Sequence, residues 1–136
     1  MAHTPTYSQA SKNLALNAAL DVLNGGFMVF YGYGLGQPAS PDVAITDQVA
    51  AVTLALNATA FAPASNGSKV ANAIGTAAIV NNVDVRWYRL YKSDGITAVH
   101  DGSVGTIDQG CDATVATTTF TAGVVCSVLS LVISIP

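Results

Sequence analysis

The hydrophobic positions of the chain follow a helical period first and a strand period afterwards. A helix is predicted over residues 11–24, where one apolar stripe has the spacing i, i+3, i+4, i+7 and consists of Leu16, Ala19, Leu20 and Leu23. The pair Gly25-Gly26 follows at once, and glycine is typical of a helix C-terminus because it adopts the left-handed conformation easily. The residues before this helix, 1–10, are expected to form a polar arm.

After Gly26 apolar and polar residues alternate, which predicts strands. The predicted strands cover residues 27–33, 49–56, 69–74, 83–92, 96–100, 114–121 and 124–135. Turns are expected at Ser93-Asp94-Gly95, Asp101-Gly102 and Asp108-Gln109-Gly110, and the last two strands are expected to form a hairpin about Ala122-Gly123. The pattern predicts a mainly β fold: one antiparallel β-sandwich or small barrel of about seven strands, spanning residues 11–136, with one N-terminal helix.

Composition adds a statement about the surface. The chain of 136 residues is 51% hydrophobic and only 10% charged, with eight Asp and no Glu, whereas an ordinary soluble domain has about 25% charged residues. The net charge of −3 argues against a nucleic-acid partner and against a basic membrane-surface helix. The apolar stretch 124–135 is shorter than the ~20 residues of a membrane span and is predicted to be a buried strand. We expect neighbouring protein, including further copies of this chain, to cover part of the exterior.

The glycine-rich segment 32–36 resembles a phosphate-binding loop only superficially. A phosphate-binding loop requires a helix to begin directly behind it, so that backbone N–H groups point at the anion. Here Gln37-Pro38-Ala39-Ser40-Pro41 follows, which prevents a helix. We therefore interpret residues 34–47 as an extended contact loop on a β domain.

Side chains that could support catalysis or metal binding are few. The histidines His3 and His100 and the cysteines Cys111 and Cys126 show no zinc-ligand spacing, and a disulfide between the cysteines is not favoured. Asp101, Asp108 and Asp112 do not follow the spacing of a calcium loop and are expected to be solvated turn residues. The sequence thus predicts no enzyme, no metal, no cofactor and no small-molecule substrate.

The strand around Trp87 carries the most informative side chains. Trp87 and Tyr88 face opposite sides of an alternating strand, so one is expected in the core and the other at an interface or under a loop. An arginine on the inward face, Arg86 or Arg89, is expected to pair with a carboxylate or to bind backbone carbonyls. The candidate carboxylates are Asp84, Asp94 and Asp101.

The ordered set of motifs over about residues 14–136 resembles small structural proteins of tailed bacteriophages and prophages. The motifs are residues 18–26, Tyr31-Gly32, residues 36–39, Ala60-Phe61, residues 86–90, residues 93–95, residues 101–105 and the segment 123–136. The longer N-terminal arm and the two cysteines depart from that pattern. The resemblance implies a virion protein without catalytic residues, made in the host bacterial cytoplasm and located on the capsid surface.

The resemblance implies the major capsid protein or other virion proteins as partners, with this chain acting as a capsid decoration or cement protein. We expect the arm and the loop to form the interface, through Thr4, Pro5, Tyr7, Tyr33, Leu35, Gln37, Pro38 and Pro41. One alternative is a neck or tail component. A second is a carbohydrate- or receptor-binding β module, which exposed Tyr31, Tyr33 or Trp87 would favour if they formed an open platform.

Overall fold

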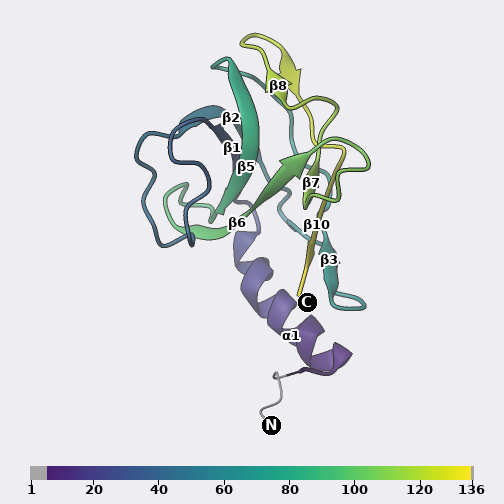
Figure 1. The fold of residues 1–136 in the computed structure, drawn as a ribbon. Helices are drawn as coiled ribbons and strands as arrows, with labels where there is room; N and C mark the ends of the chain where they lie inside the picture. Colours follow the sequence, from purple (N-terminus) through teal and green to yellow (C-terminus); the bar gives the residue numbers. More distant parts are fainter. Residues whose placement is uncertain (1–5, 136) are drawn as a thin grey trace.

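The computed structural model describes residues 6–135, which contain one α-helix, one short 3-10 helix and ten strands (Figure 1). The helices are α1 (Gln9–Leu20) and η1 (Asp21–Leu23). The strands are β1 (Phe27–Gly32), β2 (Val49–Ala55), β3 (Ser68–Val70), β4 (Ala77–Ala78), β5 (Val83–Tyr91), β6 (Ala98–Gly105), β7 (Ala113–Thr114), β8 (Thr119–Phe120), β9 (Val125–Cys126) and β10 (Ser130–Ser134).

Helix α1 begins two residues inside the predicted arm because Ser8 caps it. The Ser8 hydroxyl accepts a hydrogen bond from the backbone N–H of Ser11, at 3.1 Å, which satisfies one of the free donors of the first turn. The predicted stripe is correct at Leu16, Leu20 and Leu23, which are buried, and wrong at Ala19, which is exposed.

Asparagines complete the inner face of the helix where the stripe prediction fails. The Asn13 and Asn17 side-chain oxygens accept hydrogen bonds from the backbone N–H groups of Gly67 and Ala64, each at 3.0 Å. The segment that α1 packs against thus presents backbone donors, so this face needs acceptors beside its leucines.

Eight strands form one curled sheet in the order β2-β1-β5-β6-β7-β10-β3, with β8 added beside β5, and β4 and β9 form a separate pair (Figure 1). All pairings are antiparallel except β6 with β7, which is parallel. Met28 and Phe30 of β1 share one buried cluster with Leu131 and Ile133 of β10. The two halves of the curled sheet therefore enclose a common core.

The mainly β class with one leading helix, predicted from the sequence, is confirmed, and the strand details differ. The described residues contain more and shorter strands than the seven expected, because β4, β7, β8 and β9 have two residues each. Asp101-Gly102 is not a turn, since β6 continues through both residues. Glycine is required at position 102, because a Cβ there would collide with the Tyr88 hydroxyl and would lie 2.6 Å from Asp112 Oδ2.

The predicted C-terminal hairpin is also wrong. Strand β8 pairs with β5, β9 pairs with β4, and β10 lies between β7 and β3. The predicted buried strand 124–135 is in fact two strands, and its Val124 and Val125 are exposed. Strands β8 and β9 each pair with a strand distant in the sequence, and local periodicity does not specify such a pairing.

The two strands at the ends of the sheet order have hydrogen-bonded outer edges. Along β2, the carbonyls of Ala51 and Ala55 accept hydrogen bonds from Val80 and Gly75, at 2.8 and 2.9 Å. Along β3, the carbonyl of Val70 accepts one from Ala62 at 2.9 Å. Irregular segments therefore cover edges that would otherwise present free backbone groups.

Among the described residues, no helix has the length and apolar character that a membrane span requires.

Candidate interaction surface

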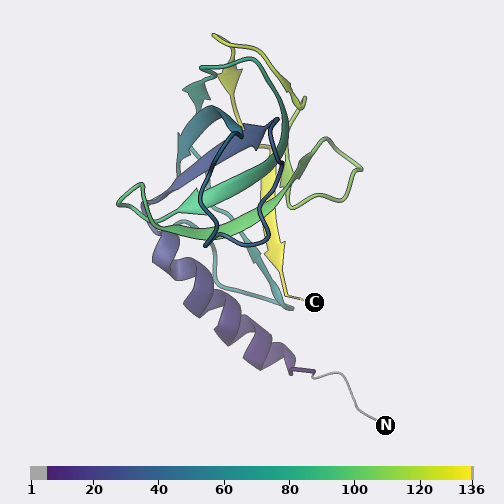
Figure 2. The same ribbon diagram turned by 60° about the vertical axis from the view of Figure 1, so that its left-hand side comes forward.

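The loop between β1 and β2, residues 33–48, lies across the outer face of the sheet and is called the cover loop below. Figure 2 shows it passing over β1 and β5. Beneath it, Val29, Tyr31 and Trp87 form a second buried cluster, against which Ile45 from the loop packs. The loop was predicted to be extended and free to lie along a neighbour. It instead folds back onto its own sheet, because this apolar outer face needs a cover.

The ends of the cover loop are joined by hydrogen bonds. Asp47 Oδ1 accepts a bond from the backbone N–H of Leu35 at 3.1 Å, and Gln48 Nε2 donates to the carbonyl of Gly36 at 2.8 Å. Gly34 has a φ of +62°, and a Cβ there would lie 2.7 Å from the backbone of Asp47. The glycines of this segment thus permit a close approach of the two loop ends, a role that differs from anion binding.

Arg89 of β5 fixes the middle of the cover loop. Its Nη1 donates to the carbonyl of Val43 at 2.8 Å, and its Nη2 donates to the carbonyl of Ser40 at 3.3 Å. The same guanidinium forms a two-pronged pair with Asp101, with Nε to Oδ1 at 2.7 Å and Nη2 to Oδ2 at 2.9 Å. We call Arg89, Asp101 and these two carbonyls the Arg89 anchor.

Both charged members of the Arg89 anchor are buried. The side chains of Arg89 and Asp101 are each only 3% exposed. The hydrogen bonds to Asp101 raise the pKa of Arg89 above its ordinary value, so the guanidinium stays charged. The sequence prediction that an inward arginine pairs with a carboxylate or binds carbonyls is confirmed, since Arg89 does both. The prediction that Asp101 is a solvated turn residue is wrong, because the buried Arg89 needs a counter-charge.

An aromatic stack lies beside the Arg89 anchor. The rings of Tyr31 and Trp87 are 4.6 Å apart and nearly parallel, at 17°, and the Arg89 guanidinium carbon lies 5.4 Å from the Trp87 ring centroid. The Tyr31 hydroxyl lies 2.8 Å from that of Tyr91. Burial, followed by this hydrogen bond, raises the pKa of Tyr31 far above its ordinary value. The expectation that Trp87 or Tyr88 lies under a loop is confirmed for Trp87, and Tyr88 is in the main core.

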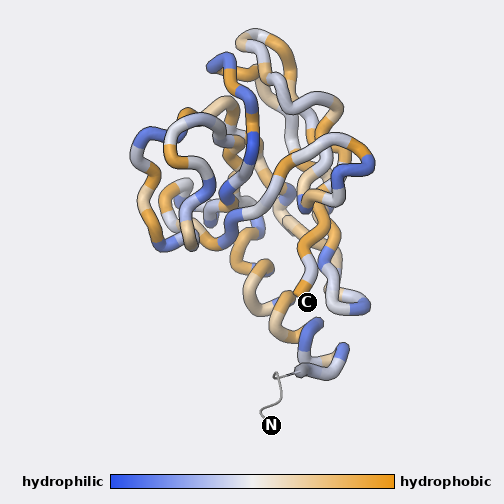
Figure 3. Tube along the Cα trace, viewed as in Figure 1, coloured by the Kyte–Doolittle hydropathy of each residue, from blue (hydrophilic) through white to orange (hydrophobic). Residues whose placement is uncertain are grey.

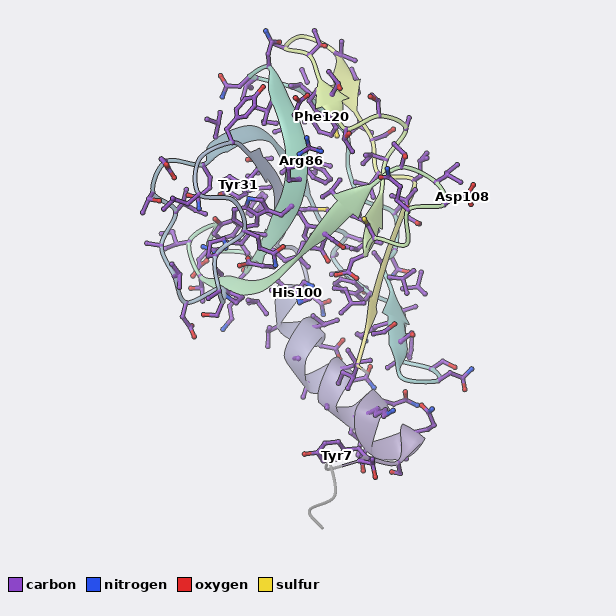
Figure 4. The ribbon with its side chains drawn as sticks, in the orientation of Figure 1. Tyr7, Tyr31, Arg86, His100, Asp108 and Phe120 are labelled. Carbon is purple, nitrogen blue, oxygen red and sulfur yellow. The ribbon has the colours of Figure 1, made fainter. Side chains whose placement is uncertain are left out.

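The predicted interface residues fall in two separate places. Thr4 and Pro5 lie outside the described residues. Tyr7 is exposed at the outer end of α1, far from Tyr31 and the cover loop (Figure 4). On the cover loop, Leu35 is 81% exposed and Tyr33 is 52% exposed. Gln37 is exposed as well, whereas Pro38 and Pro41 are half-buried.

The open aromatic platform that would favour a carbohydrate-binding module is not formed by the residues named for it. Trp87 is 1% exposed, and Tyr31 is buried with it under the cover loop. Tyr33 alone of the three reaches solvent.

Two further apolar surfaces were missed by the sequence predictions. The outer face of α1 and η1 exposes Leu14, which is 71% exposed, and Val22, each one turn from the exposed Ala18. Figure 3 shows hydrophobic colours along the part of this helical segment nearer the sheet. The signal was the scarcity of charge in the helix, since a soluble surface helix normally carries charged residues on its outer face. The second surface is a groove of about 320 Å³ between the arms of the wrongly predicted hairpin, with Phe120 and Cys126 in its lining.

Tyr88, His100 and Asp112 form a polar cluster at the junction of β5, β6 and the segment before β7. The Tyr88 hydroxyl lies 3.0 Å from His100 Nε2 and 3.5 Å from Asp112 Oδ2. Burial lowers the pKa of His100, and burial together with Asp112 raises the pKa of Tyr88 strongly. Both groups are therefore neutral near pH 7, and the cluster serves to satisfy a buried hydroxyl.

Among residues 6–135, the two cysteines remain as candidates for reactive chemistry. Cys111 and Cys126 are free thiols, and burial raises the pKa of Cys126 to about 11, which keeps it protonated. Residues 6–135 contain no group of three or more His, Cys, Asp or Glu side chains placed to bind a metal ion. His3 lies outside the described residues.

Comparison of the chain with models of protein families, with curated protein sequences and with solved structures found no significant match.

Proposed function

We propose that this chain is a non-enzymatic structural protein of a tailed-bacteriophage particle, which binds the outer surface of the major capsid protein lattice and stabilises the shell. The cover loop is the main contact, and the outer end of α1 is a second one. The role rests on the ordered motifs that resemble small virion proteins.

The observation that carries the contact assignment is the construction of the cover loop. Its exposed apolar side chains Tyr33, Leu35 and Val43 are held on a loop whose ends are hydrogen-bonded to each other and whose middle is hydrogen-bonded to the β body. Because the loop that carries these apolar side chains is already fixed, less conformational entropy is lost on binding. The low charged fraction of the whole chain, 10%, also suits a protein–protein interface, because charged residues are depleted at the centre of such interfaces.

The first test is the copy number of this chain relative to the major capsid protein, measured by quantitative mass spectrometry of purified particles. A copy number comparable to that of the shell protein supports decoration of the lattice. A few copies per particle would move the chain to the neck or tail, and absence from particles would contradict the virion assignment.

The second test is cosedimentation of the purified chain with particles that lack it. Leu35→Asp is expected to weaken binding, because it places a charge at the centre of the contact. Ile107→Asp is the matched control, since Ile107 is also exposed, beside Asp108 on a loop on the other side of the molecule from the cover loop (Figure 4). Equal binding by both variants would contradict the contact assignment.

A further inference from the structure

We infer that Arg89 is a positioning residue for the cover loop: the guanidinium, held by Asp101, fixes the loop in the shape that the partner binds, without touching the partner itself. The claim that the fixed loop binds a partner rests on the proposed function. The claim that Arg89 fixes the loop does not depend on it and can be tested separately.

The guanidinium of Arg89 is a planar group with donors in a fixed geometry. Arg89 donates two hydrogen bonds to the Asp101 carboxylate on β6 and two to the carbonyls of Ser40 and Val43 on the cover loop. Asp101 lies opposite Arg89 in the register of β5 and β6. The Asp101 carboxylate on the neighbouring strand thus orients the planar guanidinium, and the remaining N–H groups of the guanidinium point at the loop.

Contacts other than the Arg89 bonds also act on the cover loop. The hydrogen bonds at Leu35 and Gly36 join the loop ends to each other and leave the position of residues 40–43 open. Ile45 packs on the aromatic stack, and the carbonyl of Ser40 accepts a bond from Val43 within the loop. Among the side-chain hydrogen bonds of the described residues, those from Arg89 are the ones that connect residues 40–43 to the sheet.

The free energy of lifting the cover loop depends on the contacts that the loop and the cluster beneath it make. The indole Nε1 of Trp87 is buried and has no hydrogen-bond partner among the described residues. The buried cluster therefore gains no hydrogen bond from this indole in the covered state. Beside the packing of Ile45, the bonds from Arg89 are the described contacts that hold the middle of the loop on the sheet, and their loss should shift the loop toward an open ensemble.

The variant that tests this is Arg89→Met/Asp101→Leu, which removes both charges together and leaves neither unpaired in the core. Replacement of a buried ion pair by apolar residues of similar size is often tolerated. Arg86→Met is the matched control, because Arg86 lies on the same strand and is exposed. The chain contains one tryptophan, so the emission of Trp87 reports directly on whether the loop covers it.

In the double variant we expect a red shift of the Trp87 emission and stronger quenching by acrylamide, with the far-UV circular dichroism unchanged. Amide exchange at Val43, whose N–H donates to the Ser40 carbonyl, should rise by about tenfold or more, because the two Arg89 bonds that hold the Ser40 and Val43 carbonyls are lost. The Arg86→Met protein should match the wild type in every measurement. A double variant that folds with Trp87 shielded and slow loop exchange would overturn the inference.

A second variant, Arg89→Lys, decides the question if the double variant does not fold. Lysine keeps the charge beside Asp101 but cannot bind the carboxylate and two carbonyls with a planar fork. Faster exchange of the Val43 amide in a folded Arg89→Lys protein is expected, and wild-type exchange there would overturn the inference.

Particle binding, measured last, separates the two claims. A mobile loop with weakened binding supports both. A mobile loop with wild-type binding would overturn the positioning role, and a wild-type chain that binds no particle contradicts the proposed function while the loop measurements still stand.

Discussion

Two of the five cationic side chains, Lys69 and Arg89, are buried, and each fixes a peripheral segment to the β body in a different way. Lys69 Nζ donates to Asn17 Oδ1 at 2.7 Å and to the carbonyl of Ala62 at 3.0 Å, and it lies 3.0 Å from Asp21 Oδ1. We call this set the Lys69 anchor. It joins helix α1 to the segment before β3, as the Arg89 anchor joins the cover loop to β5.

The two anchors differ in the exposure of the carboxylate. The side chain of Asp21 is 56% exposed, whereas the side chain of Asp101 is 3% exposed. In the Lys69 anchor the lysine is satisfied largely by neutral oxygens, and its carboxylate remains hydrated without it. In the Arg89 anchor each charge depends on the other. The comparison teaches that the free-energy cost of removing a buried cation depends on how strongly its carboxylate partner is buried, because a buried carboxylate is left without a counter-charge.

The largest effect is expected for Arg89→Met as a single change. It leaves the Asp101 carboxylate buried without its counter-charge, and breaking such a pair typically costs ~3–5 kcal/mol. Urea unfolding followed by circular dichroism would measure the loss. The double variant Arg89→Met/Asp101→Leu should recover most of it, and a double variant as unstable as the single one would contradict this explanation.

A smaller loss, ~1–3 kcal/mol, is expected for Lys69→Met. The methionine keeps the apolar contacts, and the change leaves the Asn17 and Ala62 oxygens without this donor, while Asp21 turns to water. Thermal unfolding is the measurement, with Lys12→Met, on the helix that Lys69 binds, as the control. A loss as large as that of Arg89→Met would contradict the difference drawn between the two anchors.

Asp21→Asn should change the free energy of unfolding by less than ~1 kcal/mol, because pairs with a well-solvated carboxylate contribute little. Asp101→Asn provides the contrast, since it removes a buried charge beside Arg89 and should cost several times more. Equal costs in urea titrations of the two proteins would show that the exposure of the carboxylate does not govern the difference.

The smallest expected effect is a pH dependence that belongs to neither anchor. Because burial lowers the pKa of His100 in the folded state, the unfolded chain binds more protons below about pH 6.5. Stability should therefore be full above that pH and decline as the pH falls toward the folded pKa. His100→Gln should flatten the decline between pH 7 and pH 5, and an unchanged slope would assign the titration to another group.

The sequence predicts β1 and β5 well because their patterns are local. Alternation at Phe27–Gly32 and Val83–Tyr91 marks both strands, and the inward Arg89 requires an acceptor wherever it lies. The same reasoning fails at Asp101-Gly102, where a dipeptide typical of turns lies inside β6. There the long-range requirements of Arg89 and Tyr88 override the local turn preference.

The cover loop shows a similar division between local and distant information. Its glycines and prolines predict a loop, and exposed Tyr33 and Leu35 lie on it as expected. Its folded-back course depends on contacts 46 to 49 positions apart in the sequence, between Arg89 and the Val43 and Ser40 carbonyls. The C-terminal hairpin fails for a related reason, because β8 and β9 pair with β5 and β4 rather than with each other.

The covered edges of β2 and β3 have a consequence for the chain at high concentration. A protein with so few charges has weak electrostatic repulsion between copies, and exposed strand edges would then favour stacking of copies into aggregates. Segments 61–65 and 75–81 hydrogen-bond to those edges before another chain can. Many copies of this chain can therefore accumulate at one site while association through strand edges is suppressed, leaving side-chain surfaces to select the contacts.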